Sequence, residues 1–142
     1  LVLLKTLLAI MATQYLNTPY KWGGNNYDGL DCSGLIIRTL RDIGQNVPDM
    51  SAQSISHWAA DRKDSQSCEP GEDCLLFFGS RLSSISHVAI ALSGGKFMIE
   101  SGGAGRESVT MAPSDLARID ARVRIKPISN RKDLIASIRI KY

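Results

Sequence analysis

A cysteine at the expected start of a helix is the residue best suited to chemistry in this chain. Cys32 lies in the sequence Asp31-Cys32-Ser33-Gly34, and the apolar residues after it recur at the spacing of one helix face. The sulfur would therefore lie among the unpaired backbone N–H groups of a helix N-terminus, whose partial positive charge favours a thiolate. These properties predict a nucleophile, although many cysteines near helix starts are simply small buried apolar residues.

The loop that precedes this cysteine has the composition of a ligand-binding segment. In Tyr20-Lys21-Trp22-Gly23-Gly24, the glycines allow the backbone to approach a ligand closely, while Tyr20 and Trp22 offer aromatic surface and a phenolic O–H donor. We therefore expect this loop to form part of the same site as Cys32.

A base for the cysteine has few candidates, because the chain contains only two histidines. His87 stands in an alternating segment, Ser86 to Leu92, with bulky side chains on one face and His87 with two alanines on the other. We expect a helix to pack closely over the alanines and bring its N-terminal cysteine to His87. His57, beside Trp58 in a predicted helix, is expected to be a surface or structurally satisfied histidine.

Glu100 is the predicted third member of the site. A two-residue turn at Gly94-Gly95 sets a hairpin register in which the numbers of opposed residues add up to 189, so Ala89 faces Glu100. The carboxylate then lies on the histidine face, diagonal to His87, where it would fix the imidazole tautomer and stabilise its charged form. A one-residue bulge in the hairpin would undo this register and leave Glu100 exposed at a strand end.

The order of the predicted elements indicates an α+β fold. Helices dominate the first half of the chain, over residues 1–15, 31–44 and 51–61, the last with Ser51 as its N-cap. Strand patterns dominate the second half, over residues 75–78, 86–92, 96–101, 108–111 and 122–127. A short helix is expected to end at Ile119, and the tail is either a helix or a strand.

Length and composition fit one globular domain comprising residues 1–142. Apolar residues make up 44% and charged residues 22% of the chain, as in ordinary globular proteins. The net charge of +3 is spread over scattered lysines and arginines, which argues against a nucleic-acid-binding surface. The apolar N-terminal run is too short to cross a bilayer and has no small-residue cleavage site, so we expect a core helix there.

The other two cysteines leave two alternatives open. Cys68 and Cys74 lie on either side of a Pro-Gly turn, so they either form a disulfide in an oxidising compartment or stay reduced, and the spacing favours neither. A zinc site that combines them with His57 would lack four ligands at recognised spacings. If the disulfide forms, Cys32 is left as the odd thiol.

Five motifs together resemble the NlpC-type cell-wall cysteine peptidases, a papain-like family of peptidoglycan endopeptidases. They are Thr18-Pro19-Tyr20-x-Trp22-Gly23-Gly24, Asp31-Cys32-Ser33-Gly34-Leu35, Pro70-Gly71, Phe77-Phe78 and His87-Val88-Ala89-Ile90. The resemblance runs from about residue 5 to residue 125, nearly the whole chain. It implies N-terminal helices packed on a central antiparallel β-sheet.

The resemblance also implies a reaction. Enzymes of this kind hydrolyse peptide bonds in peptidoglycan stem peptides, often between D-γ-glutamate and a diamino acid, without a metal or other cofactor. By position, the matching site residues are Cys32 as nucleophile, His87 as base, Tyr20 beside the oxyanion, and Asp31 and Ser33, which bind the free amine of an N-terminal L-alanine in some members. The third polar position is usually His, Asn or Gln in the family, whereas this chain offers Glu100.

Other functions of the same scaffold stay open at the level of sequence. They are an amidase, transpeptidase or acyltransferase that uses the same cysteine and histidine, and a degenerate wall-binding module. The expected partner is peptidoglycan outside the cytoplasm, for a secreted or cell-envelope protein or a phage-borne one. We expect a monomer, with no nucleic-acid partner and no stable insertion in a membrane.

Overall fold

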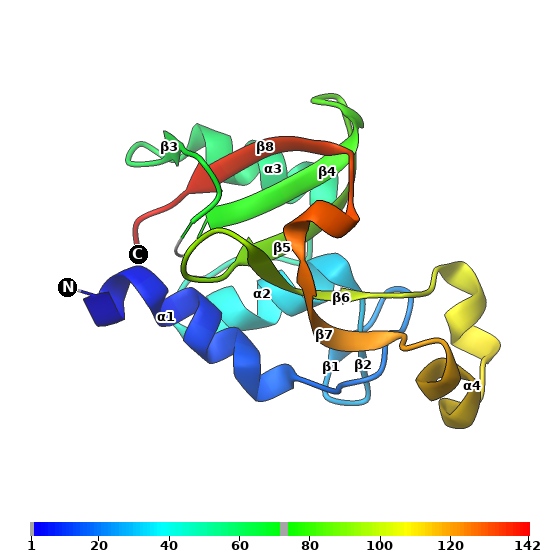
Figure 1. The fold of residues 1–142 in the computed structure, drawn as a ribbon. Helices are drawn as coiled ribbons and strands as arrows, with labels where there is room; N and C mark the ends of the chain where they lie inside the picture. Colours follow the sequence, from blue (N-terminus) through cyan, green and yellow to red (C-terminus); the bar gives the residue numbers. More distant parts are fainter. Residues whose placement is uncertain (1, 72–73) are drawn as a thin grey trace.

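The computed structural model describes residues 2–71 and 74–142 of the chain (Figure 1). Its helical segments are α1 (Val2–Ala12), η1 (Thr13–Tyr15), α2 (Cys32–Asp42), α3 (Ala52–Asp61), η2 (Arg106–Thr110), α4 (Pro113–Arg118) and η3 (Ile128–Asn130). Its strands are β1 (Asn25–Asn26), β2 (Gly29–Leu30), β3 (Gln66–Ser67), β4 (Cys74–Arg81), β5 (Ser84–Ala91), β6 (Phe97–Gly102), β7 (Arg122–Pro127) and β8 (Leu134–Arg139). The expected order, helices first and strands after them, is confirmed.

Six strands form one antiparallel sheet in the order β3-β8-β4-β5-β6-β7. Helices α1, α2 and α3 pack against this sheet through one large apolar cluster. In Figure 1, α4 lies at the opposite end of the molecule from the two chain termini. The C-terminal tail forms β8, which lies between β3 and β4, so the tail is a strand rather than a helix.

The two faces of β5 belong to two separate apolar clusters. Val88 and Ile90 pack with helical residues such as Leu35 in the large cluster, whereas Ala89 and Ala91 lie in a smaller cluster. The expectation that a helix packs over the alanines is therefore wrong. Branched side chains present more apolar area for an amphipathic helix to bury than alanines do, so α2 packs on the bulky face instead.

A β-bulge brings the start of α2 to this strand. In the pairing of β4 with β5, Phe78 faces His87, but the next residue of β4 faces Ile85. Ser86 is therefore an extra residue on β5, and bulges of this kind bend a strand and re-aim its side chains. The carbonyl oxygen of Ser86 lies 4.0 Å from Sγ of Cys32, the first residue of α2.

The hairpin of β5 and β6 has the predicted register. Ile90 faces Ile99, so the residue numbers of opposed pairs add up to 189 as expected. The N–H of Gly95 donates a hydrogen bond of 3.1 Å to the carbonyl three residues before it. The turn therefore begins one residue earlier in the chain than predicted. The shift of the turn leaves the register unchanged. This register places Glu100 on the same face of the sheet as His87.

One predicted strand is wrong. Residues 108–111 belong largely to the 3-10 segment η2 rather than to a strand. The N–H of Ser108 donates to the carbonyl of Gly105 (3.0 Å), and the hydroxyl of Thr110 donates to the carbonyl of Glu107 (3.2 Å). Local hydrogen bonds of serine and threonine favour such turns over extended pairing.

The expected helices are confirmed, with small changes at their ends. Ser51 caps α3 by accepting a hydrogen bond of 3.1 Å from the N–H of Ser54. The first helix gives way at Ala12 to the 3-10 turn η1, and Leu1, where the expected range begins, lies outside the described residues. No helix in the described part of the chain is long and apolar enough to cross a membrane.

The close approach of Gly34 to Gly24 joins α2 to the aromatic loop. A Cβ atom on Gly34 would lie 2.1 Å from the carbonyl oxygen of Gly24. The same oxygen accepts a hydrogen bond of 3.2 Å from the N–H of Asp31. A residue without a side chain is therefore needed where the loop lies against the first turn of the helix.

Gly34→Ala is expected to lower the free energy of unfolding by about 1–3 kcal/mol, because the added methyl group pushes the loop away from the helix. Gly71→Ala is the matched control, since the nearest atom to a Cβ there is 3.7 Å away. Urea unfolding followed by circular dichroism measures both variants. A Gly34→Ala protein as stable as the wild type would contradict this close packing.

Candidate active site

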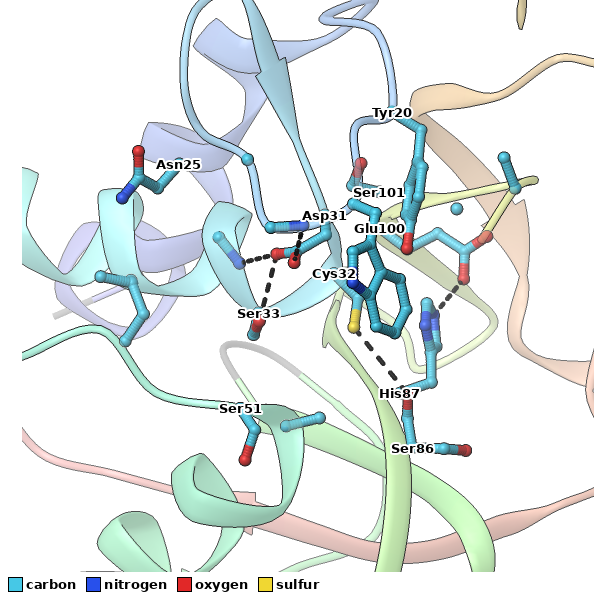
Figure 2. Close-up of a pocket in the computed structure, with 18 of the residues that line it drawn as sticks. Tyr20, Asn25, Asp31, Cys32, Ser33, Ser51, Ser86, His87, Glu100 and Ser101 are labelled. Atoms are coloured by element: carbon cyan, nitrogen blue, oxygen red, sulfur yellow. Dashed lines mark hydrogen bonds and ion pairs between the residues drawn. The ribbon is translucent and has the colours of Figure 1, made fainter. Parts of the chain in front are cut away.

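Asp31 caps α2 and ties it to the aromatic loop (Figure 2). Its Oδ1 accepts hydrogen bonds from the N–H of Gly34 (2.7 Å) and the hydroxyl of Ser33 (3.1 Å). Its Oδ2 accepts one from the N–H of Gly23 (2.9 Å). A carboxylate in this position binds donors that the helix leaves unpaired and complements the positive end of the helix. Cys32 follows directly and is half-buried.

Ser101 couples the start of α2 to β6. Its buried hydroxyl donates a hydrogen bond of 2.6 Å to the carbonyl of Leu30, two residues before Cys32. Because Ser101 follows Glu100 on β6, this bond fixes the cysteine and the carboxylate relative to each other. Sequence reasoning missed Ser101, since a serine within a strand carries no distinctive signal.

His87 and Glu100 form the buried pair that the hairpin register predicts. Nε2 of His87 lies 2.7 Å from Oε1 of Glu100, and the residues are 8% and 3% exposed. With Nε2 bound to the carboxylate, Nδ1 is the ring nitrogen left for the thiol of Cys32, which also interacts with the imidazole. The ring of Phe78 packs against the imidazole, with centroids 5.5 Å apart.

The surroundings of His87 favour its charged form. Burial alone would lower the pKa of the imidazole, but the hydrogen bonds and charges of Cys32 and Glu100 outweigh burial and raise the pKa of His87 to about 9. The imidazolium is therefore the expected form at neutral pH. A protonated histidine beside a cysteine is the usual arrangement for an activated thiol nucleophile.

Tyr20 is held by the segment that follows β6. It is 5% exposed, packs with Leu116 and Ala121, and donates its N–H to the carbonyl of Ala121 (3.0 Å). In Figure 2 its hydroxyl points toward Cys32 and Glu100. Burial, and after it the negative charge of nearby acidic groups, raises the pKa of Tyr20. The hydroxyl therefore stays protonated as a hydrogen-bond donor.

The segment η2 positions Trp22. The N–H of Trp22 donates to Oγ of Ser108 (2.9 Å), and the guanidinium of Arg106 lies 5.3 Å from the centre of the indole ring. Trp22 is nevertheless 46% exposed, so aromatic surface is left for a ligand. The segment that the sequence pattern predicts as a strand thus supports a residue of the site.

One cleft of about 800 Å³ lies at this place. The predicted site residues that line it are Tyr20, Trp22, Asp31, Cys32, Ser33, His87 and Glu100. They come from the aromatic loop, the start of α2, the bulge of β5 and the end of β6. The structure therefore brings together every residue that the sequence assigns to the site.

The second histidine and the other cysteines lie outside the cleft lining. Nε2 of His57 contacts the side-chain amide of Gln53 at 3.1 Å, as expected for a structurally satisfied residue. Cys68 and Cys74 are free thiols, and burial, followed by the neighbouring Cys74, raises the pKa of Cys68. Among the described residues, no group of three or more His, Cys, Asp or Glu side chains is placed to hold a metal ion.

The sequence profile of the NlpC/P60 family matches residues 17–119, a range that contains Tyr20, Cys32, His87 and Glu100. The chain belongs to the NlpC/P60 family. This is a family of cell-wall hydrolases that act on peptidoglycan, and it also includes non-catalytic members. The resemblance noted in the sequence is thereby confirmed.

Two longer proteins match part of this chain in sequence. Protein P54 of Enterococcus faecium is 41% identical over 93 residues, which cover 61% of this chain and 16% of that protein. The bifunctional muramidase/DL-endopeptidase CwlT of Bacillus subtilis (strain 168) is 32% identical over 88 residues, which cover 60% of this chain and 26% of that protein. This chain therefore spans about a quarter or less of either relative.

Solved structures confirm the fold. The NlpC/P60 domain of the peptidoglycan hydrolase SagA superposes with a TM-score of 0.67 at 23% identity, covering 96% of this chain and 98% of that one. RipD of Mycobacterium tuberculosis, described as a non-catalytic domain adapted to peptidoglycan binding, gives 0.65 at 18% identity and covers 96% of each chain. The fold is α+β and papain-like, with N-terminal helices on an antiparallel sheet, as expected.

In an NMR titration, the ring of His87 is expected to titrate near pH 9. In Glu100→Gln the midpoint should fall, because the carboxylate no longer stabilises the imidazolium. Since the pKa is raised in the fold, the pair stabilises the protein fully below pH 6.5 and progressively less as the pH rises through about 9. A His57→Asn variant assigns the two ring signals. A wild-type midpoint near pH 6.5 that Glu100→Gln leaves unchanged would contradict the pairing.

Proposed function

We propose that this chain is a cysteine peptidase that hydrolyses peptide bonds in peptidoglycan stem peptides through a covalent intermediate on Cys32. One observation carries the proposal: Cys32, at the start of a helix, interacts with His87, and Nε2 of His87 is 2.7 Å from the buried carboxylate of Glu100. This is the arrangement of a nucleophile, a base and an orienting group. Membership of the NlpC/P60 family indicates the polymer on which they act.

In the first half-reaction, the sulfur of Cys32 attacks a carbonyl carbon of the stem peptide, and a tetrahedral oxyanion forms. The proposed donors to this oxyanion are the backbone N–H of Cys32, at the start of the helix, and the hydroxyl of Tyr20. A donor of this kind typically contributes about 3 kcal/mol to the transition state. His87 gives its proton to the leaving amine, the C–N bond breaks, and a thioester on Cys32 remains.

In the second half-reaction, neutral His87 takes a proton from water as the water attacks the thioester. The same two donors hold the second oxyanion. When this intermediate collapses, the C–S bond breaks, the carboxylic acid product leaves, and the proton taken up by His87 either stays on the imidazolium or passes to the released sulfur of Cys32. Glu100 keeps the ring in one tautomer and stabilises its charged form throughout.

The bond that we propose for cleavage joins D-γ-glutamate to a diamino acid. The name of the CwlT relative, a DL-endopeptidase, supports this assignment. Asp31 and Ser33 line the cleft beside Cys32 and are proposed to bind the amine end of the stem peptide. An ionised carboxylate has about four acceptor sites, so the three hydrogen bonds that Asp31 accepts from the protein leave it room for an ammonium group.

We propose that residues 1–142 act as one domain and as a monomer, because the proposed nucleophile, base, orienting carboxylate and oxyanion donors form a complete set within a single chain. Peptidoglycan lies outside the cytoplasm, so the proposed place of action is extracytoplasmic, either secreted or in the cell envelope.

Cys32→Ala is expected to abolish the clearing of a peptidoglycan suspension while the protein still binds the wall, because one thiol at the mouth of a cleft contributes little packing. Cys68→Ala is the control and should keep full activity, since Cys68 lies outside the cleft lining. Turbidity loss and a wall pull-down measure the two properties. Activity of Cys32→Ala near the wild-type level would refute the nucleophile.

Mass spectrometry of the products from a defined muropeptide separates the alternative reactions. Two fragments that together gain one water indicate hydrolysis, and their masses identify the bond. A new amide between stem peptides would indicate a transpeptidase. Binding without any product from the wild type would indicate a wall-binding module like RipD, which has the same fold.

Tyr20→Phe is expected to lower kcat by about 10²-fold with little change in KM, because it removes one oxyanion donor and keeps the packed ring. Steady-state kinetics on a muropeptide measure the effect, and a thermal melt confirms that the fold is kept. An unchanged kcat would exclude the hydroxyl from the oxyanion site.

A further inference from the structure

An arginine binds the second carboxylate oxygen of Glu100. Arg124 lies on β7 directly opposite Glu100 on β6, and its Nε donates to Oε2 at 3.0 Å. His87 binds the other oxygen, Oε1, at 2.7 Å. Glu100 is 3% exposed, so both oxygens of a buried carboxylate contact basic side chains from the two strands that flank β6.

The guanidinium of Arg124 is itself held in place. Its side chain is 17% exposed, and Nη1 donates to the backbone carbonyl of Asp120 at 2.9 Å and approaches Oδ2 of the same residue at 3.5 Å. Asp120 also pairs with Arg122 (2.6 Å) and Lys126 (3.1 Å), which lower the pKa of its carboxyl to about 2. Asp120 is therefore an ionised anchor for Arg124 at any working pH.

Two glycines, the last residue of β6 and the residue after it, make room for this pair. A Cβ on Gly102 would lie 3.1 Å from Oε2 of Glu100 and 3.3 Å from Nη2 of Arg124. A Cβ on Gly103 would lie 3.0 Å from Nη1 of Arg124. Larger residues at these positions would press on the guanidinium in a tightly packed region.

We propose that Arg124 is a positioning residue, which fixes the carboxylate of Glu100 so that Glu100 in turn orients His87 for the reaction at Cys32. The inference rests on the proposed cysteine peptidase function and adds Arg124 as a fourth member to the series Cys32, His87 and Glu100. A carboxylate held at one oxygen rotates easily about its last torsion, whereas a second charged hydrogen bond fixes its plane. The guanidinium also offsets the desolvation of a charge that is almost completely buried.

Arg124 is the basic group, besides His87, that stabilises the charge of Glu100. The groups that face His87 are Cys32 from α2, Glu100 from β6, the ring of Phe78 from β4 and, at longer range, Asp133 before β8. Asp133 is paired with Arg131 at 2.8 Å, which balances its charge. Burial opposes the ionisation of Glu100, but His87 and then Arg124 outweigh burial and lower its pKa.

The test compares the pH dependence of muropeptide hydrolysis in wild type and Arg124→Gln. Without the guanidinium Glu100 takes up a proton more readily, so the acid limb of kcat/KM should move up by about one pH unit. At the pH optimum kcat should fall on the order of 10-fold, with KM little changed. An Arg124→Gln enzyme with the wild-type profile would overturn the role.

Arg122→Gln is the matched control. Arg122 lies two residues away on the same face of β7 and contacts the same Asp120, but its further partner is Asn17 rather than Glu100. This variant should keep the wild-type acid limb and kcat. An equal shift in Arg122→Gln would show a general effect of basic charge and would overturn the specific role of Arg124.

Alkylation of Cys32 by iodoacetamide across pH gives a readout that needs no substrate. A pH profile of alkylation that shifts in Arg124→Gln but not in Arg122→Gln supports the positioning role. If the wild type then fails to hydrolyse peptidoglycan, the proposed function fails and the positioning role stands. If the wild type hydrolyses peptidoglycan and neither its kinetic profile nor its alkylation profile shifts in Arg124→Gln, the positioning role alone fails.

A double variant tests whether Arg124 acts through Glu100. In a Glu100→Gln background, Arg124→Gln should have little further effect on kcat, whereas fully additive losses would contradict the coupling. If Arg124→Gln fails to fold, Arg124→Lys serves as the test variant. A lysine keeps the positive charge but cannot contact Glu100 and Asp120 at the same time. The kcat of Arg124→Lys should lie between those of wild type and Glu100→Gln, and a full wild-type kcat would overturn the proposal.

Discussion

The buried carboxylate of Glu100 is the group on which the arrangement of the site depends. A carboxylate that is 3% exposed is strongly destabilised unless cations or hydrogen-bond donors surround it. Here His87 binds one oxygen and Arg124 the other, and each of the three residues comes from a different neighbouring strand. A slip of one residue in either strand pairing would turn a partner to the opposite face of the sheet. The registers of β5, β6 and β7 are therefore tied to one ion-pair network.

A second requirement is that the start of α2 reaches this network from the other side of the strand. The helix packs on the bulky face of β5, whereas His87 belongs to the face that carries the small cluster. The extra residue at Ser86 bends the strand at this point and brings its carbonyl within 4.0 Å of Cys32. Two hydrogen bonds then fix the first turn of the helix. Asp31 accepts one from the aromatic loop, and Ser101 of β6 donates the other to the residue before Asp31.

The parts of the site that the sequence predicts are those that depend on local chemistry. The helix that begins at Cys32 follows from the spacing of its apolar residues, and Glu100 follows from the short turn that joins two adjacent strands. Arg124 does not follow in this way, because β7 pairs with β6 across a connection that contains η2 and α4, and no short turn sets its register. The packing of α2 was equally nonlocal: an alternating strand has two faces, and only the tertiary structure shows which one meets the helix.

A peptide aldehyde tests the proposed nucleophile and the proposed oxyanion donors in one experiment. A stem peptide whose scissile carbonyl is replaced by an aldehyde should add to Cys32 as a hemithioacetal, which mimics the tetrahedral intermediate. A crystal structure of this complex is expected to show a bond from Sγ of Cys32 to the aldehyde carbon, with the oxygen about 3 Å from the N–H of Cys32 and the hydroxyl of Tyr20. An aldehyde bound in the cleft without a bond to Cys32, or with its oxygen turned away from both donors, would contradict the proposed mechanism.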